Sequence, residues 1–464
     1  MAYSSWTLTL AVGLAILFIS RIFRPSKIAG HPPLPPGPKG LPLLGNLNDL
    51  PKPGVLEAHH WLKHKDLYGP ISSVTVMGQT LIIINDARLT FKLLEKRSAK
   101  HPSRPKQIFA GEIEAGSVIL KIVYGYTAES HKSDPLIDMA GDAMDKFGRA
   151  AVPGAFLVDI MPFLRRVPAW FPGTGFQQTA HHWASELKDT TEKPYAFVKH
   201  QMAQGKNEPS FLSQLLDQSG ADAEEAFNHK WSALSLYTGG ADTTVSSIAC
   251  FFLAMTAFPD AQRKAQEEID RVIGQSRLPT MADRESLPYI DATVKEVLRW
   301  NPVGPMNLPH TSDEDDIVEG YYIPKGSMLL ANIWHFTHDP NVYHEPMVFK
   351  PERFLPTNGH EPEPDPQMYA FGFGRRVCPG RNLAENALYL NVVQSLAAFS
   401  IGKEIRDGRE VEPTIKFEPG IVSHPAPFRN LIKPRSPQHE QLIRSIEQIY
   451  PWQESDSKVL ESMG

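Results

Sequence analysis

Cysteine is scarce in this chain of 464 residues, and so is any excess of charge of one sign. The two cysteines, Cys250 and Cys378, stand in unrelated contexts, which excludes a disulfide framework and is typical of a reducing compartment. Acidic residues (52) barely outnumber basic ones (47), so the chain lacks the basic surface that nucleic-acid binding requires. We therefore expect no nucleic-acid partner.

A long apolar run is present near the N-terminus, from Trp6 to Phe23. At about 1.5 Å per residue it extends roughly 27 Å, which is marginal for a hydrocarbon core of about 30 Å. Arg21, Arg24 and Lys27 stand at its end, and no charged residue precedes it. The positive-inside rule therefore predicts a single-pass anchor over residues 1–30 with the rest of the chain in the cytosol. A cleaved signal peptide is the alternative, but it would need basic residues before the run and a small-residue cleavage site after it.

Proline is abundant (41 residues) and is concentrated just after the apolar run. Pro32 to Pro42 can form neither helix nor interior strand, because proline lacks the N–H donor and fixes φ. We predict a stiff hinge over residues 31–50, a globular domain over 51–435 and a polar tail over 436–464. The tail has an apolar stripe whose spacing predicts a helix packed on the surface: Leu442, Ile443, Ile446 and Ile449.

Within the globular domain, the patterns predict a mainly α protein with small β-sheets. Ile71 to Val76 and Thr80 to Ile84, separated by Gly78-Gln79, are typical of a β-hairpin. Helix-like patterns dominate from Ser117 to Arg299, and a strand-rich stretch runs from Ile317 to Ile333.

The most informative segment runs from Phe371 to Gly380 and reads Phe-x-x-Gly-x-Arg-x-Cys-x-Gly. Gly374 and Gly380 allow backbone conformations that let the chain fold tightly around the sulfur of Cys378. Backbone N–H groups in such a turn can stabilise a thiolate, and Arg376 offers a fixed cation suited to a carboxylate. The segment favours a thiolate metal ligand; a buried free cysteine after a glycine loop is the alternative.

This segment resembles the haem-binding loop of the cytochrome P-450 superfamily, the haem-thiolate monooxygenases. The resemblance implies that Cys378 is the axial iron ligand, that Arg376 pairs with a haem propionate, and that Phe371 packs beside the sulfur. A thiolate donor pushes electron density onto iron and favours O–O cleavage. The resemblance extends over residues 31–434. The sequence from Ile119 to Tyr126 is similar to that of fungal members.

A second matching segment, Gly239 to Thr244, interrupts a helical pattern that runs from about Glu224 to Phe258. Its glycines and threonines are expected to weaken the helix locally. By itself the segment could equally be a loose helix crossing. The resemblance implies three roles beside the iron, with Thr243 holding water or dioxygen, Asp242 relaying protons, and Gly240 leaving room for dioxygen.

Three further residues resemble a cluster that holds the core beneath the haem. Glu296 and Arg299 share one face of a predicted helix, and Arg353 follows at the distance where the superfamily has its second arginine. Buried ionic groups persist when they are mutually paired, so we interpret the trio as structural.

Other matches are less specific. His310 stands where many relatives bind a propionate, although a lone histidine is more often incidental. Arg375 and Arg381 could contact an acidic reductase or be ordinary solvated charges. The stretch from Phe156 to Phe176 combines apolar residues with two arginines. In membrane-bound relatives the comparable region dips into the bilayer; a surface loop over the core is the alternative.

One departure from the superfamily is serious. Relatives have a helix with Trp-x-x-x-Arg that binds the propionates, and no tryptophan of this chain has arginine four positions later. Several tens of residues are expected to be missing near residues 111–117, after the first hairpin, including that helix and a bundle helix. Loss of the bundle helix would expose apolar surface, at a cost in folding free energy of about 25 cal/mol for each Å². The haem would also lose the two propionate partners, so we expect haem to bind weakly or not at all.

The resemblance implies a monooxygenase of secondary metabolism with haem as cofactor, anchored in the endoplasmic reticulum membrane. An NADPH-dependent reductase would supply the electrons, and one atom of O2 would enter an apolar small molecule. The alternatives are a truncated, non-catalytic variant with impaired haem binding, a haem-thiolate isomerase or dehydratase needing no reductase, and a haem-free tethered protein. Asp242 and Thr243 disfavour the isomerase or dehydratase, which needs no proton relay to dioxygen.

Overall fold

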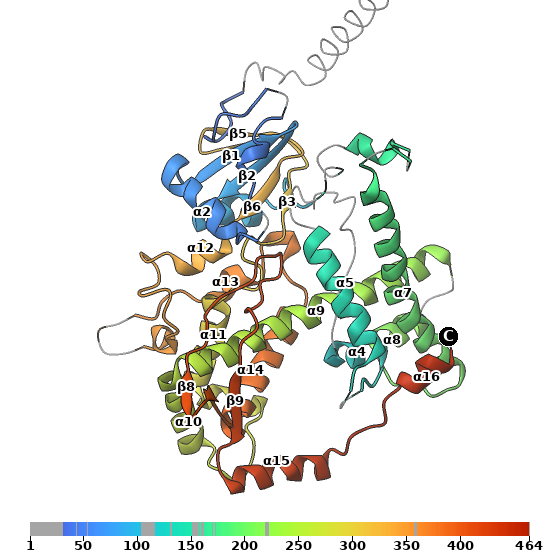
Figure 1. Cartoon of the computed structure of the whole chain (residues 1–464), viewed down its shortest axis with the longest axis vertical. Coiled ribbons are helices and arrows are strands. Elements are labelled where there is room, and N and C mark those ends of the chain that lie inside the picture. Colours follow the sequence, from blue (N-terminus) through green and yellow to red (C-terminus); the bar gives the residue numbers. More distant parts are fainter. Residues whose placement is uncertain are drawn as a thin grey trace, which may run out of the picture.

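The computed structural model describes residues 31–103, 117–150, 162–218, 222–356 and 361–463, apart from isolated positions within these ranges, and the single residues Phe156, Val158 and Gly359. The predicted membrane anchor and most of the predicted gap near residues 111–117 lie outside the described residues. The described chain is mainly helical with three small sheets, as the sequence predicted (Figure 1).

The first sheet contains the predicted hairpin. Strands β1 (Ile71–Val76) and β2 (Gln79–Ile84) pair antiparallel around Met77 and Gly78, whose φ angles of 48° and 92° suit a tight two-residue turn. β2 therefore begins one residue earlier than predicted. Strand β6 (Met328–Ala331) pairs parallel with β2, and β3 (His310–Thr311) pairs antiparallel with β6, which gives the order β1-β2-β6-β3.

Short elements surround this sheet. The stretch from Ile317 to Ile333 is strand-rich as predicted, since β4 (Asp316–Val318) and β5 (Tyr321–Ile323) form a separate two-stranded sheet before β6. The short helical elements that precede and follow the strands are η1 (Leu47–Asp49), α2 (Glu57–Tyr68), α3 (Ala87–Thr90), η2 (Phe91–Lys96), α12 (Ile333–His338), η5 (Pro351–Phe354), α13 (Gln367–Ala370) and η6 (Gly374–Arg376).

Long helices make up the rest of the domain, with α9 (Ala223–Ala257) at their centre. Its start is fixed by Asp222, whose carboxylate accepts a hydrogen bond from Glu225 N at 2.7 Å. The helix runs unbroken through Gly239 to Thr244, and its bounds agree with the helical pattern predicted from about Glu224 to Phe258. The other elements are α4 (Ser117–Tyr124), α5 (Pro135–Ala150), η3 (Pro162–Arg166), α7 (Gly175–Ala203), α8 (Phe211–Gln218), α10 (Pro259–Val272), η4 (Met281–Ser286), α11 (Pro288–Trp300) and α14 (Arg381–Ala398).

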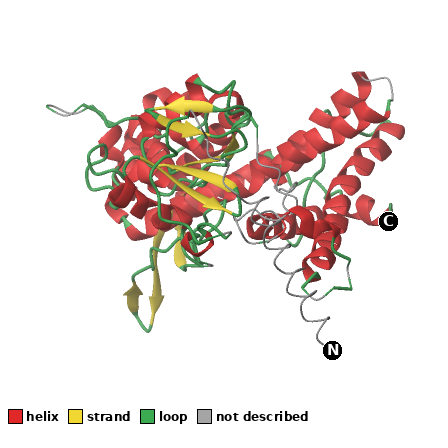
Figure 2. Ribbon diagram, turned by 90° about the horizontal axis from the view of Figure 1, so that it is seen from above, coloured by secondary structure: helices red, strands yellow, loops and turns green. Residues whose placement is uncertain are grey.

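Helix α9 belongs to two hydrophobic cores and connects them. Its second half, around Phe251, packs with α10, α11 and α14, while its first half, around Tyr237, packs with α4, α5, α7 and α8. Figure 2 shows α9 running from the half that contains the strands to this second group of helices. Among the described helices, α9 is the one long and apolar enough to span a membrane, and its place between two cores explains that composition.

Near its end the chain forms a sheet and a short helix that the sequence did not predict, and one helix that it did. Strand β7 (Phe399–Arg406) pairs antiparallel with both β8 (Arg409–Val411) and β9 (Asn430–Pro434), forming a third sheet that was missed. The predicted tail helix is confirmed as α15 (Pro437–Ile449), which packs against α14. A further helix, α16 (Ser457–Ser462), was missed.

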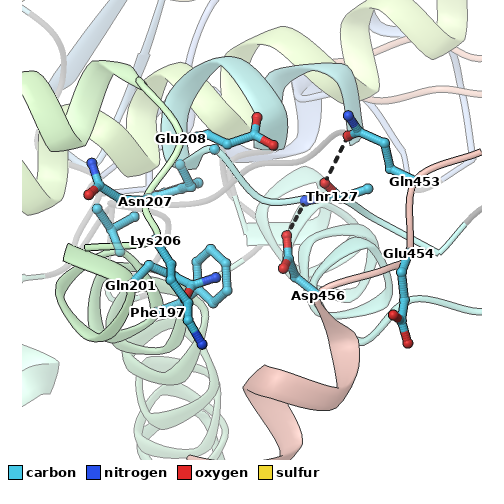
Figure 3. A pocket seen from close by; sticks show the side chains of 12 residues that line it. Thr127, Phe197, Gln201, Lys206, Asn207, Glu208, Gln453, Glu454 and Asp456 are labelled. Carbon is cyan, nitrogen blue, oxygen red and sulfur yellow. Dashed lines mark hydrogen bonds between the residues drawn. The ribbon is translucent and has the colours of Figure 1, made fainter. Parts of the chain in front are cut away.

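The last residues dock on the second group of helices. Thr127, in the loop after α4, donates its backbone N–H to the Asp456 carboxylate at 2.8 Å and accepts a bond from Asp456 N at 2.9 Å. Leu460 of α16 is buried in the core around Tyr237. Beside this docking point lies a polar hollow of about 150 Å³ (Figure 3), lined by Tyr124, Gly125, Thr127, Phe197, Val198, Gln201, Lys206, Asn207, Glu208, Gln453, Glu454 and Asp456.

We predict that Asp456→Ala lowers the free energy of unfolding by roughly 1–2 kcal/mol, because it removes a carboxylate that accepts a backbone hydrogen bond. Urea unfolding of the purified chain measures the loss. The matched control is Glu454→Ala, which removes an exposed carboxylate that pairs with Lys458 on the same short segment. Equal stability of the two variants would contradict the docking role of Asp456.

Candidate functional site

The Cys378 loop is folded as tightly as its glycines predicted. The Cys378 backbone N–H donates to the Phe371 carbonyl at 2.8 Å and closes the loop. Gly374 has a φ of +58°, and a Cβ there would lie 2.3 Å from the carbonyl oxygen of Leu94. Only glycine fits at this position, so the close approach of the loop to η2 depends on it.

The sulfur of Cys378 is free and partly buried at the end of this loop. Burial raises the pKa of the thiol, and a hydrogen bond from Gly380 N–H opposes that effect. Helix α14 begins directly afterwards, at Arg381, whose guanidinium lies 5.5 Å from the centre of the Phe371 ring. Phe371 is thus next to Cys378 through the backbone, and its ring packs against the core around Phe251.

The two residues predicted to bind carboxylates meet on one short stretch of chain, residues 101–103. His310, which is buried, has its Nδ1 2.9 Å from the carbonyl oxygen of His101. Arg376 Nε donates to the carbonyl of Pro102 at 2.6 Å. The next carbonyl, of Ser103, accepts from Thr311 N at 2.7 Å. The structure therefore brings Arg376 and His310 together, although 66 positions separate them in the sequence.

In the middle of α9, the threonines bond the helix backbone as expected. Thr243 Oγ1 donates to Gly239 O at 2.8 Å, and Thr244 Oγ1 donates to Gly240 O at 2.6 Å. A Cβ at Gly240 would lie 2.6 Å from Cδ1 of Ile119 on α4. Gly240 therefore lets α4 pack closely against α9, and its role toward dioxygen stays a prediction.

Asp242 has a partner that the sequence did not reveal. The Nε2 atom of His424 lies 3.1 Å from the Asp242 carboxylate, and both side chains are partly exposed. His424 belongs to the loop between β8 and β9, 182 residues further along the chain. No local pattern links the two residues, so sequence reasoning had no signal for this pair.

The predicted structural cluster forms, and it is buried. Arg299 Nε donates to Glu296 Oε2 at 2.7 Å, and Arg353 Nε donates to Glu296 Oε1 at 3.1 Å. Glu296 and Arg299 are fully buried and Arg353 is 2% exposed. A fourth member, Glu363, was missed and accepts from Arg353 Nη1 at 2.6 Å. Arg299 also donates to the Thr337 carbonyl, so the cluster joins α11, α12 and η5.

Comparison with models of protein families shows to which family the chain belongs. The family model for cytochrome P-450 matches residues 115–432, which is more than half of the sequence. The chain belongs to the cytochrome P-450 family.

Three fungal relatives of this cytochrome P-450 extend the match. Cytochrome P-450 monooxygenase ppsD of Aspergillus oryzae is 44% identical, with 93% of this chain and 94% of the relative covered. Cytochrome P-450 monooxygenase claR of Ampulloclitocybe clavipes is 41% identical, with 94% and 92% covered. O-methylsterigmatocystin oxidoreductase of Aspergillus flavus is 40% identical, with 92% of each covered. This cytochrome P-450 is therefore an oxidoreductase of the monooxygenase type.

The same alignments show that the chain is shorter than its relatives within the matched region. The alignment with the Aspergillus oryzae relative runs over 497 residues, whereas 93% of this chain is about 430 residues. About 65 aligned positions therefore have no counterpart here. The alignment with the Ampulloclitocybe relative, over 503 residues and 94% of this chain, gives a similar shortfall. The position of the missing residues near 111–117 stays a prediction.

Family membership implies a haem-thiolate cofactor, and the residues on the cysteine side fit it. Cys378 supplies a free thiol on a rigid loop, and thiolates are soft ligands that suit iron. Among the described residues, no group of three or more His, Cys, Asp or Glu side chains could hold a metal ion. Cys378 would ligate the haem iron, and Arg376 and His310, which bond the carbonyls of Pro102 and His101, would be available for the carboxylates of the cofactor.

Proposed function

We propose that this cytochrome P-450 inserts one oxygen atom from O2 into an apolar small molecule, with electrons from NADPH delivered by a separate reductase. The observation that carries the proposal is the Cys378 loop, closed by its backbone bond to Phe371 and followed directly by α14. When bound there, a thiolate-ligated haem supplies the oxygen-activating chemistry. The names of the fungal relatives describe monooxygenases and oxidoreductases, and they support an oxygenase reaction in secondary metabolism.

The chain's own residues then have separate tasks. Cys378 holds the iron, and Arg376 and His310 hold the carboxylates of the cofactor, since a fixed guanidinium matches a carboxylate well. Thr243 and Asp242 on α9 hold water and pass protons toward the site. Glu296, Arg299 and Arg353 fix the polypeptide beneath the cofactor and take no part in the reaction.

The shortfall of about 65 positions bears directly on this proposal. Because Trp-x-x-x-Arg is missing from the sequence, Arg376 and His310 remain as the candidates for binding the propionates. The sequence led us to expect that haem binds weakly or not at all; under the proposed function haem is bound, but more weakly than in relatives that have these positions. The comparisons give no support to a non-catalytic variant.

The test is expression of the full chain with a fungal NADPH-dependent reductase. The first measurement is haem per chain, together with the absorption of the reduced carbon monoxide complex, which reports thiolate ligation. The second is transfer of isotope-labelled oxygen from O2 to candidate apolar substrates. We expect labelled product that depends on both NADPH and the reductase. A chain without haem, or turnover that needs neither NADPH nor reductase, would overturn the proposal.

We also propose that the chain is a membrane protein of the endoplasmic reticulum with its domain in the cytosol. The anchor over residues 1–30 carries this proposal, and a second surface supports it. Trp170 and Phe171 are 81% and 52% exposed, an unusual exposure for large aromatic side chains, and their rings are in edge contact. The exposed Arg165 and Arg166 stand close by in sequence, suited to lipid phosphates.

We predict that Trp170→Phe reduces the quenching of tryptophan fluorescence by bromine-labelled lipids in vesicles that carry the full chain. Aromatic side chains at the lipid interface come close enough to the acyl chains to be quenched. The control is Trp452→Phe in the C-terminal tail, where the side chain is 61% exposed and lies in no segment predicted to contact the membrane. If the two variants lose the same quenched fraction, Trp170 does not enter the bilayer.

A further inference from the structure

His424 faces the carboxylate that the proposed function uses for protons. Its Nε2 atom lies 3.1 Å from an Asp242 carboxylate oxygen. The side chain of His424 is 32% exposed and that of Asp242 is 21% exposed. Both groups are thus partly exposed, and the imidazole is in reach of solvent water.

The loop that carries His424 is fixed against α9 and α11 by its neighbour Ser423. Ser423 is 1% exposed, and its carbonyl accepts hydrogen bonds from Ser246 Oγ at 2.6 Å and from Asn301 Nδ2 at 3.2 Å. The His424 carbonyl in turn accepts from Glu418 N at 2.7 Å. Hydrogen bonds to the carbonyls of Ser423 and His424 therefore hold the backbone on both sides of the imidazole.

The register of these bonds explains why His424 meets Asp242. Ser246 lies four residues after Asp242 on α9, so the two side chains share one face of the helix. When Ser246 holds the carbonyl of Ser423, the next side chain along the loop is brought to the level of Asp242. The contact between His424 and Asp242 therefore follows from the hydrogen bond between Ser246 and the Ser423 carbonyl.

We propose that His424 is a positioning residue that orients the Asp242 carboxylate and delivers solvent protons to it, an inference that rests on the proposed function. Histidine is the side chain whose ordinary titration allows it both to accept and to donate a proton near neutral pH. In each transfer, a hydronium ion from solvent gives a proton to Nδ1 as Nε2 gives its own to the carboxylate oxygen. One O–H and one N–H bond break, one N–H and one O–H bond form, water is left, and no electrons are exchanged. Rotation of the partly exposed ring then restores the starting arrangement.

A purely structural pair would behave differently. Ion pairs that are partly exposed to water contribute little to stability, because solvent screens the charges and both side chains lose freedom. Loss of His424 should therefore leave folding and haem content unchanged while it slows proton delivery. Slow proton delivery in an oxygenase diverts NADPH-derived electrons into hydrogen peroxide, so the ratio of product to NADPH reports the role directly.

The test uses the full chain with haem and reductase, comparing wild type with His424→Gln, which keeps a hydrogen-bond donor but cannot shuttle protons. We expect product per NADPH to fall at least about threefold, peroxide to rise to match, and the solvent isotope effect to increase, with haem content and KM unchanged. His344→Gln is the matched control, because His344 is 78% exposed beside Glu345 and far along the chain from this site. It should behave as wild type.

Two further measurements separate the possible failures. In an Asp242→Asn background, His424→Gln should cause no additional loss, since the partner is already gone. In isotope-labelled histidine spectra of the chain, the signal missing from His424→Gln should shift in Asp242→Asn, which reports the contact without any turnover. Unchanged coupling in His424→Gln, or full additivity with Asp242→Asn, overturns the role of His424 alone. A wild-type chain without NADPH-dependent turnover overturns the proposed function, and this inference with it.

Discussion

Replacing Cys378 by alanine abolishes haem retention and all NADPH-dependent oxygenation, the largest effect that we expect from any single substitution. Loss of a residue that merely supports a metal ligand already costs about 10–100-fold in metal affinity or activity. Cys378 is the proposed ligand itself, so its loss should exceed that range. Haem per purified chain and the spectrum of the reduced carbon monoxide complex measure the result. Haem bound at the wild-type ratio with an unchanged spectrum would contradict the assignment.

The other cysteine provides the control for this experiment. Cys250 is fully buried in α9, and burial raises the pKa of its thiol to about 12. Its sulfur accepts a hydrogen bond from Asn301 Nδ2 at 3.2 Å, so it has a packing role in the core around Phe251. Cys250→Ala should keep haem and colour, which shows that the effect at position 378 is not a general consequence of losing a thiol.

The parts of the site that the sequence predicted are those encoded by local patterns. The Cys378 loop needs glycines at fixed places within ten residues, and the structure shows why for Gly374, which touches the backbone at Leu94. The hairpin and α9 follow from alternation and from helical periodicity in the same way. The Glu296 cluster was found through its resemblance to the superfamily, because Glu296 and Arg299 share one helix face and Arg353 follows at the matching distance.

What the sequence could not show depends on contacts between distant segments. His424 reaches Asp242 because a loop is tied to α9 through Ser423, and nothing near either residue reveals that bond. The meeting of Arg376 and His310 at residues 101–103 is equally non-local. The third sheet is a different case, since Asp407-Gly408 is a hairpin signal that joins β7 to β8 and could have been recognised.

Glu296→Gln should destabilise the folded chain by about 3–5 kcal/mol, the cost of breaking a buried ion pair from one side. Arg299 and Arg353 would stay buried with much of their compensating charge removed. The loss is a large part of a typical stability of about 5–15 kcal/mol, so the yield of folded protein should fall sharply. Urea unfolding of the wild type and the variant measures the difference.

The comparison that interprets this result is Glu267→Gln on α10. Glu267 pairs with Arg263 at 2.7 Å, also as a glutamate–arginine pair on one helix, but it is 62% exposed. Its loss should cost less than about 1 kcal/mol, because water screens an exposed pair. If Glu296→Gln costs no more than this control, the cluster does not hold the core together. If the larger loss persists in chains prepared without haem, the cluster acts on the polypeptide itself, because the cofactor is then absent from both the variant and the wild type.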